Sequence, residues 1–216
     1  MAAQVSYGAS TELDAVNSIL MSVGESPVNT ITNVQSPEVV IAKNTLRQAC
    51  REVLAEGWVF NTEKQYPIAL DSNLHCIVPN NVLQLDVNAF KHLDDFHVVM
   101  RKDNGVLKLY DMHDHSFKFE NTGDNKLYVD VIWMYEFEDI PQVFRDYITA
   151  RASRMASNRM VNDPKAAELM ATDESLARAL AMEYDANQAD YNIFNDQEGR
   201  TNPGTVYRPY KVLQRR

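Results

Sequence analysis

The spacing of the apolar residues changes twice along this chain of 216 residues, from a helical period to a strand-like one and back. Apolar side chains recur at helical spacing over residues 11–23 and 36–57, as on the buried face of a helix. From Trp58 to about Tyr135 the runs are short and rich in β-branched and aromatic residues, which is typical of strands. The helical period returns from about residue 141 to 194. These changes predict an α+β protein, an α-helical bundle of about four helices with an inserted small antiparallel β-sheet domain.

Short sequence signals mark where the expected helices begin and end. Thr11 and Asp14 have the spacing of a capping box, and Gly24 supplies a left-handed stop for the first helix. Proline at the first helical position starts two further helices, in Ser36-Pro37 and in Asp163-Pro164. We therefore expect helices that begin near residues 11, 36, 141 and 163.

The apolar faces of these helices predict what is buried. We expect Leu20 and Leu46 in one packed core, with Trp58 buried where the second helix ends. On the third helix the arginines fall largely on the face opposite the apolar one; they are Arg145, Arg151, Arg154 and Arg159. The apolar pattern of the last helix runs through Leu169, Leu176, Leu180 and Tyr184.

The strand-like region contains two candidate hairpins. Asp103-Asn104-Gly105 separates two strand-like runs, and Asn and Gly tolerate the positive φ values of a tight turn. The stretch SFKFENTGDNKLYVDV, residues 116–131, suggests a second hairpin. Together the patterns predict a helical adaptor domain from residues 1–57 and 138–194, an inserted β-rich domain over 58–137, and an extended C-terminal arm over 195–216.

The arm is the most informative segment for function. Residues 199–216 carry a charge of about +5 and no acidic residue, whereas the preceding residues carry about −14. Aromatic and basic residues alternate in it, and the arm residues of interest are Arg200, Tyr207, Arg208, Tyr210 and Lys211. This mixture favours docking on a protein surface in extended form. A nucleic-acid-binding arm and a disordered tail remain the alternatives.

Net charge and cysteine content narrow the class of protein. The chain has 30 acidic against 21 basic residues and a formal charge of −9, which disfavours general binding to phosphates. Its two cysteines, Cys50 and Cys76, lie in apolar patterns and are predicted to be free thiols in a reducing compartment. No apolar run has the length of a membrane span, and the start MAAQVSYGAS lacks the features of an export signal. We expect a protein that folds in the cytoplasm and does not bind membranes.

Candidate catalytic and metal-binding residues are few. His113-Asp114-His115 lacks further ligands at a suitable spacing, and we interpret it as a solvated turn. The remaining histidines are scattered and have no nucleophile motif beside them; they are His75, His92 and His97. The acidic pairs Glu136 with Glu138 and Asp94 with Asp95 are interpreted as exposed surface. No glycine-rich phosphate loop is present, so we predict no enzyme, no cofactor and no metal.

Three blocks of sequence carry a resemblance to a known family. The stretches AVNSILMSVGESPVNT, REVLAEGWVFNTE and IPQVFRDYITARASRMASNR follow one another in this order, with a strand-rich region before the last. In composition, order and spacing the chain resembles the tail tubular protein A family, the head-to-tail adaptors of short-tailed phages. The resemblance covers most of residues 11–194.

The resemblance implies a structural protein of the virion tail, folded in the host cytoplasm. A homo-oligomer ring of twelve copies would sit between the portal protein and the tail nozzle protein, tail tubular protein B, with genome DNA passing through without sequence-specific binding. The arm would then fasten the ring to the portal. The hairpin tips, at Asn104, Gly105 and Gly123, would face the nozzle. An excess of carboxylates suits a DNA channel, because like charges keep DNA from adhering to its wall.

A hydrolase is the alternative from a different class. It would act on cell-surface glycan or peptidoglycan through a carboxylate pair such as Glu136 and Glu138. No motif in the sequence demands this activity, so the adaptor is the favoured interpretation.

Overall fold

A computed structural model describes residues 10–32, 36–88, 96–120, 122, 124–161 and 163–189. Within these residues the chain forms four α-helices and two antiparallel sheets, which confirms the predicted α+β fold class. The helices are α1 (Glu12–Ser22), α2 (Pro37–Leu54), α4 (Gln142–Met160) and α5 (Pro164–Ala189). The strands are β1 (Thr62–Ala69), β2 (Val82–Val87), β3 (Val98–Asp103), β4 (Val106–Asp111) and β5 (Lys126–Trp133). The predicted arm, residues 195–216, lies outside the described residues.

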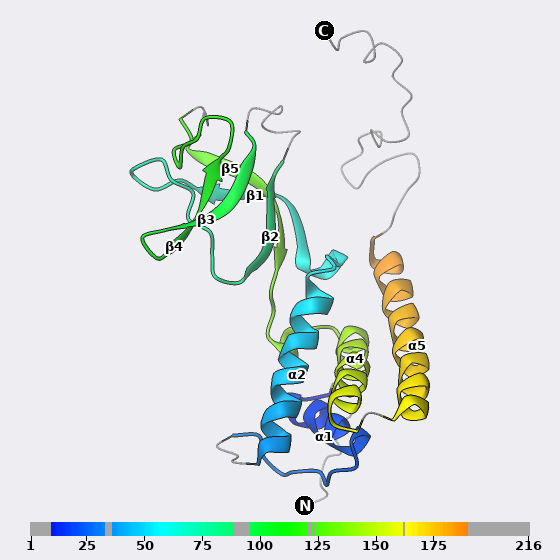
Figure 1. The fold of residues 1–216 in the computed structure, drawn as a ribbon. Coiled ribbons are helices and arrows are strands. Elements are labelled where there is room, and N and C mark those ends of the chain that lie inside the picture. Colours follow the sequence, from blue (N-terminus) through cyan, green and yellow to red (C-terminus); the bar gives the residue numbers. More distant parts are fainter. Residues whose placement is uncertain are drawn as a thin grey trace, which may run out of the picture.

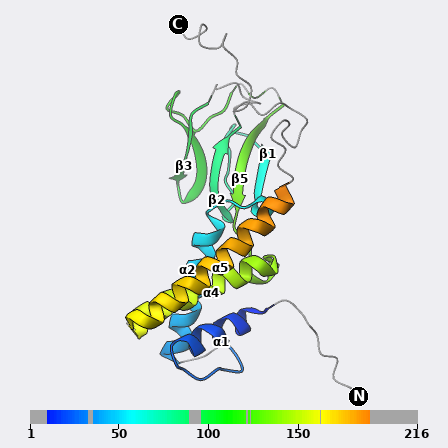
Figure 2. The ribbon, with the colours of Figure 1, turned by 90° about the vertical axis from the view of Figure 1, so that its right-hand side faces the viewer.

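The helices form a layer, and the strands lie beyond the C-terminal end of α2 (Figure 1). Within the layer α4 lies between α2 and α5, and α1 packs against both α2 and α4. Figure 2 shows the same order from the side of α5, with α4 behind it. The helices α2 and α5 are therefore the two flanks of the layer.

The termini of α1 and α5 follow the sequence signals. The hydroxyl of Thr11 accepts a hydrogen bond from the backbone N–H of Asp14, whose carboxylate accepts one from the N–H of Thr11, so the predicted capping box is confirmed. Gly24 has a φ of +84°, which a glycine adopts without strain. At the start of α5, the carboxylate of Asp163 accepts from the N–H of Lys165.

At the start of α2, Pro37 is the first helical residue as predicted, but Ser36 makes no capping hydrogen bond with its side chain. Its hydroxyl donates instead to the carboxylate of Glu38. Gly57, after the helix, has a φ of +77°, and a Cβ there would lie 2.8 Å from the side chain of Ile132. The turn out of α2 therefore requires glycine.

The helical core contains the residues that the apolar faces predicted. Leu20 and Leu46 are each 1% exposed, and Trp58 is 6% exposed with its indole N–H donating to the carbonyl of Val53. Beside Trp58 the buried side-chain amide of Asn61 donates to the carbonyl oxygens of Leu54 in α2 and Trp133 in β5. This amide fixes the end of α2 to the end of the central strand.

The larger sheet has three strands in the order β1-β5-β2, all antiparallel. Its apolar face forms a second core cluster, separate from the helical one, which includes Leu127, Val129 and Val131 of β5. The strand β2 was not among the predicted runs. Its exposure does not alternate regularly, and it pairs with β5 across more than 40 positions of sequence.

The smaller sheet is the hairpin of β3 and β4, which confirms the turn at Asn104 and Gly105. The second predicted hairpin, over residues 116–131, is wrong. β5 pairs with β1 and β2, whereas Ser116 and Lys118 make only isolated bridges to Asp111 and His75. Phe119, from the same run, is fully buried in the strand cluster.

Candidate functional site

The tip of the β3–β4 hairpin is one of the predicted contact sites. Asn104 and Gly105 have φ values of +49° and +81°, as in the type I′ turn that joins two antiparallel strands tightly. Both residues are exposed, and nothing lies within 4 Å of a Cβ built on Gly105. The tip is therefore open to a partner or an insertion. Gly123, the other predicted nozzle-facing residue, lies outside the described residues.

Side-chain contacts hold this hairpin rigid. The ammonium group of Lys108 lies 2.8 Å from the carboxylate of Asp103, across the two strands. The guanidinium of Arg101 lies over the ring of Tyr110, 4.0 Å from its centroid. A tip held in this way presents one conformation to a partner, which lowers the entropic cost of binding.

The predicted arm residues, Arg200, Tyr207, Arg208, Tyr210 and Lys211, lie outside the described residues. Their role in binding a portal stays a prediction. The same holds for His92, Asp94 and Asp95, which also lie outside the described residues.

A pocket of about 350 Å³ brings together the carboxylate pair of the hydrolase hypothesis. Glu136 and Glu138 line it from the segment that follows β5, with Glu12 of α1 and Arg47 and Cys50 of α2. Burial, reinforced by the charge of Glu136, raises the pKa of the Cys50 thiol to about 12. The thiol is therefore protonated at neutral pH and is a poor nucleophile.

The other candidate chemical groups do not converge. The imidazole of His113 lies 2.9 Å from the carboxylate of Asp114, and both side chains are largely exposed, as on a solvated turn. Cys76 is free and buried, and burial raises the pKa of its thiol to about 12. Within the described ranges, no three His, Cys, Asp or Glu side chains gather as metal ligands would. None of the helices in those ranges is long and apolar enough to span a bilayer.

The arginines of α4 differ from their predicted place on a solvent face. Arg151 is half-buried and pairs with Glu52 of α2 at 2.8 Å and with Glu174 of α5 at 3.3 Å. Arg154 also pairs with Glu174, and Arg145 donates to the backbone carbonyls of Ser10 and Glu138. The reason is that α4 lies between α2 and α5, so its polar side chains meet neighbouring elements before they reach solvent.

The leucines of α5 differ from a core pattern in the opposite sense. Leu169 is 70% exposed, Leu176 62% and Leu180 52%, whereas Tyr184 packs on Phe144. Small side chains face α4 instead: Ala181 is buried in the helical core and Ala177 packs against it. Because alanine allows two helices to approach closely, α5 docks on its alanine side and leaves its leucines outside.

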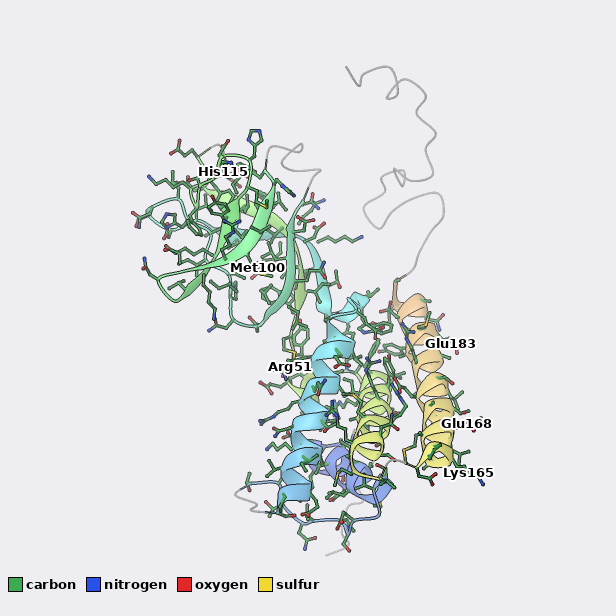
Figure 3. All side chains as sticks on the ribbon, in the orientation of Figure 1. Arg51, Met100, His115, Lys165, Glu168 and Glu183 are labelled. Atoms are coloured by element: carbon green, nitrogen blue, oxygen red, sulfur yellow. The ribbon has the colours of Figure 1, made fainter. Side chains whose placement is uncertain are left out.

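These leucines belong to a continuous stripe on the outer side of α5. We call it the α5 face; it consists of Leu169, Asp173, Leu176, Leu180 and Glu183, spaced at helical intervals and all exposed. Neither Asp173 nor Glu183 makes an ion pair within the part of the chain that the structure describes. Figure 3 shows Glu183 and Glu168 pointing outward from α5, away from α4.

A stripe with the same spacing lies on the opposite flank. We call it the α2 face; it consists of Val40, Asn44, Arg47 and Arg51, all exposed. Val40 is 45% exposed, and its neighbour Ile41 is 39% exposed. Figure 3 shows Arg51 pointing outward from α2, on the side away from α4 and α5. Among the described residues, Arg47 and Arg51 make no ion pair.

Neither face was singled out in the sequence. The signal was present in the last helix, where two apolar stripes run side by side: leucines at 169, 176 and 180, and alanines at 177 and 181. Periodicity alone favours the larger side chains as the core. Only the position of α4 decides which stripe is buried.

Comparison with known proteins identifies one family. The family model described as tail tubular protein matches residues 13–191, from α1 through both sheets to the end of α5. No curated protein matches the chain. The match covers more than half of the chain, and it includes both faces and the β3–β4 hairpin.

Proposed function

The chain belongs to the tail tubular protein family, and we propose that within this family it is a ring-forming adaptor that joins the head of a phage to its tail. Family membership makes the chain a structural component of a phage tail and places it in the virion. The step from tail protein to ring is supported by the α5 face, whose three leucines are each more than half exposed. Exposed apolar stripes of this kind mark surfaces that bind other proteins.

The proposed ring contains twelve copies, by the family resemblance, and lies between the portal and the tail nozzle. The basic arm, with Tyr207 and Tyr210 as apolar anchors, would attach the ring to the portal. The rigid tip at Asn104 and Gly105 would contact the nozzle protein, tail tubular protein B. It lies at the strand-rich end of the molecule, away from α1 (Figure 1).

The central channel of the proposed ring carries the genome without binding it. Residues 1–198 have a net charge of about −14, so a channel built from this part of the chain repels the phosphate backbone. A basic wall would instead hold the DNA through counterion release. Sequence-specific contacts play no part in this passage.

The proposed domain division follows the two core clusters. Residues 1–57 with 138–194 would form the ring-building helical adaptor domain, and 58–137 the inserted domain that carries the nozzle contact. One cluster lies among the helices and the other among the strands, and Tyr135 packs against both. Trp58 and Phe137, at the two ends of the insert, pack in the helical cluster and anchor it there.

Assembly of particles tests the adaptor role directly. Particles made without the chain are expected to keep filled heads and to lack tails, because nothing joins the portal to the nozzle. Purified chain added to such heads should appear by cryo-electron microscopy as a ring at the portal vertex, and nozzle protein should then attach. Tails that attach equally well without the chain would overturn the proposed function.

A bulky insertion between Asn104 and Gly105 tests the nozzle contact. The tip has open space around it, so the fold should tolerate the insertion while attachment of nozzle protein is lost. An insertion of the same length after Asp114, in the exposed turn after β4, is the matched control. Normal nozzle attachment with the first insertion would exclude this tip as the contact.

The second candidate function is hydrolysis of cell-surface glycan or peptidoglycan. The pocket lined by Glu136 and Glu138 is the observation that favours it, since retaining and inverting glycosidases both use two carboxylates. Glu136→Gln with Glu138→Gln should leave tail assembly intact under the adaptor proposal. Release of soluble glycan by the purified chain, abolished in this variant, would establish the hydrolase instead.

A further inference from the structure

We infer that the ring is built by one repeated contact, in which the α5 face of one copy docks on the α2 face of the next. This inference rests on the proposed ring and specifies which surfaces form it. The occupant of the leucine stripe is thus a second copy of the chain. Three observations support it: the placement of the two faces, their chemistry, and their matching length.

The two faces lie on opposite flanks of one helical layer. The helices are ordered α2, α4, α5 across the layer, and Arg51 and Glu183 point outward in opposite directions (Figure 3). A contact between two different patches on opposite sides of a subunit is heterologous, and repeating it generates a closed ring when the rotation closes. A contact between two identical patches would stop at a dimer.

The chemistry of the two faces is complementary. The α5 face carries Asp173 and Glu183 beside its leucines, and the α2 face carries Arg47 and Arg51 beside Val40. These four charges have no ion-pair partner within the described part of their own chain. Docking gives each a partner of opposite sign and removes apolar surface from water on both sides.

The lengths and directions of the two faces also agree. From Val40 to Arg51, and from Leu169 to Leu180, the stripes each span about 16 Å of helix axis. Both helices run from the α1 end of the layer toward the strands (Figure 1). When copies are related by rotation about an axis along the layer, Arg51 near the end of α2 therefore meets the end of α5 that carries Glu183.

A mixing experiment tests this contact with two variants of the full chain. Leu176→Glu with Leu180→Glu disables the α5 face, and Arg47→Glu with Arg51→Glu disables the α2 face. All four positions are exposed, so folding should be unchanged by circular dichroism and thermal unfolding. Met182→Glu is the matched control, because Met182 is 54% exposed on α5 but lies off the stripe.

The wild-type chain and the Met182 control should form rings, read by native mass spectrometry at rising concentration and on heads that lack the chain. Each face variant alone should lose every species larger than the monomer. A one-to-one mixture of the two variants should give dimers and nothing larger, because one intact α5 face meets one intact α2 face and neither product can extend. No isologous contact produces this pattern.

The outcomes separate the contact from the function. Rings formed by both face variants, or a mixture that stays monomeric while the wild type forms rings, would overturn the inferred contact and leave the adaptor role standing. Monomeric wild type both in solution and on heads would overturn the ring itself. A chain whose own arm covers the α5 face would stay monomeric until residues 200–216 are removed, which would also overturn the contact as stated.

Discussion

Glu174 is a carboxylate that the fold turns inward on an otherwise solvated helix. Its residue is 8% exposed, and its two carboxylate oxygens are taken by Arg151 and Arg154 of α4. Arg151 also reaches Glu52 of α2, so three helices share one charge network. The network fixes α5 on α4 with its alanines inward, and this leaves its leucines outside.

Loss of the Glu174 charge should destabilise the helical layer. Glu174→Gln leaves two half-buried guanidinium groups without a full counter-charge, at a cost of about 1–3 kcal/mol in the free energy of unfolding. Glu168→Gln, an exposed glutamate on the same helix, is the control and should change stability by less than about 0.5 kcal/mol. Urea unfolding of both variants measures the difference, and equal stabilities would show that the network contributes nothing.

A pair of leucines on different helices separates core from contact surface. Leu46→Ala removes a side chain that is 1% exposed and should cost about 2–5 kcal/mol of stability. Leu169→Ala removes one that is 70% exposed, so the monomer should unfold within about 0.5 kcal/mol of the wild type. Thermal unfolding at concentrations too low for oligomers compares them. A large loss for Leu169→Ala would mean that α5 packs differently.

At the scale of elements, the local signals predicted structure well. The capping box at Thr11, the prolines at 37 and 164 and the Asn104-Gly105 turn each depend on a few adjacent residues, so the sequence alone determines them. Pairing across long sequence distances leaves no such mark. For that reason β2 was missed, and β5 was assigned to the wrong hairpin.

The candidate site was less predictable than the elements. The tip of the β3–β4 hairpin followed from turn chemistry, but the α5 and α2 faces depend on which side of each helix meets α4. That choice is set by tertiary packing: Ala181 is buried and Leu180, one residue earlier, is half-exposed. The Glu174 network was missed for the same reason, because its partners come from two other helices.

The capping box of α1 should make stability depend on pH. The backbone N–H and hydroxyl of Thr11 donate to Asp14 and hold the pKa of that carboxyl below its usual value of 3.8. A lowered pKa stabilises the folded state above the unfolded value, and the stabilisation is lost as the pH falls through the lower folded value. Asp14→Asn should therefore be less stable at pH 7, by about 0.3–1 kcal/mol from the helix dipole.

The difference between wild type and Asp14→Asn should shrink below pH 3.8 and vanish once the carboxyl is protonated in the folded state. Thermal unfolding across this range, with an NMR titration of the Asp14 carboxyl, measures both quantities. A stability difference that stays constant down to complete protonation would show that the charge of Asp14 is not the cause.

At the scale of the whole molecule, charge is distributed unevenly. About +5 lies in residues 199–216 and about −14 in the rest, so the arm and the body attract opposite partners. An acidic body suits a channel that must not hold DNA, and it would also repel its neighbours in a ring. The pairing of Arg47 and Arg51 with the acidic α5 face would offset this repulsion where copies touch.

The arm should attach the ring to the portal without contributing to the fold of the body. Truncation after Gly199 removes none of the described core, so unfolding should be unchanged while affinity for isolated portal rings falls. Tyr207→Ala with Tyr210→Ala should cause much of the same loss, because aromatic anchors carry most of the binding energy at such contacts.

Charge reversal separates anchoring from steering within the arm. Arg208→Glu with Lys211→Glu should slow association with the portal more than it speeds dissociation, since charges at the rim of an interface mainly steer the encounter. The effect should fade as salt is raised, because added ions screen the interaction beyond about 10 Å at 0.1 M. Surface plasmon resonance on immobilised portal rings gives both rates. Full affinity without residues 200–216 would exclude the arm as the attachment, and tight binding of the isolated arm peptide to DNA at physiological salt would identify a nucleic-acid contact in its place.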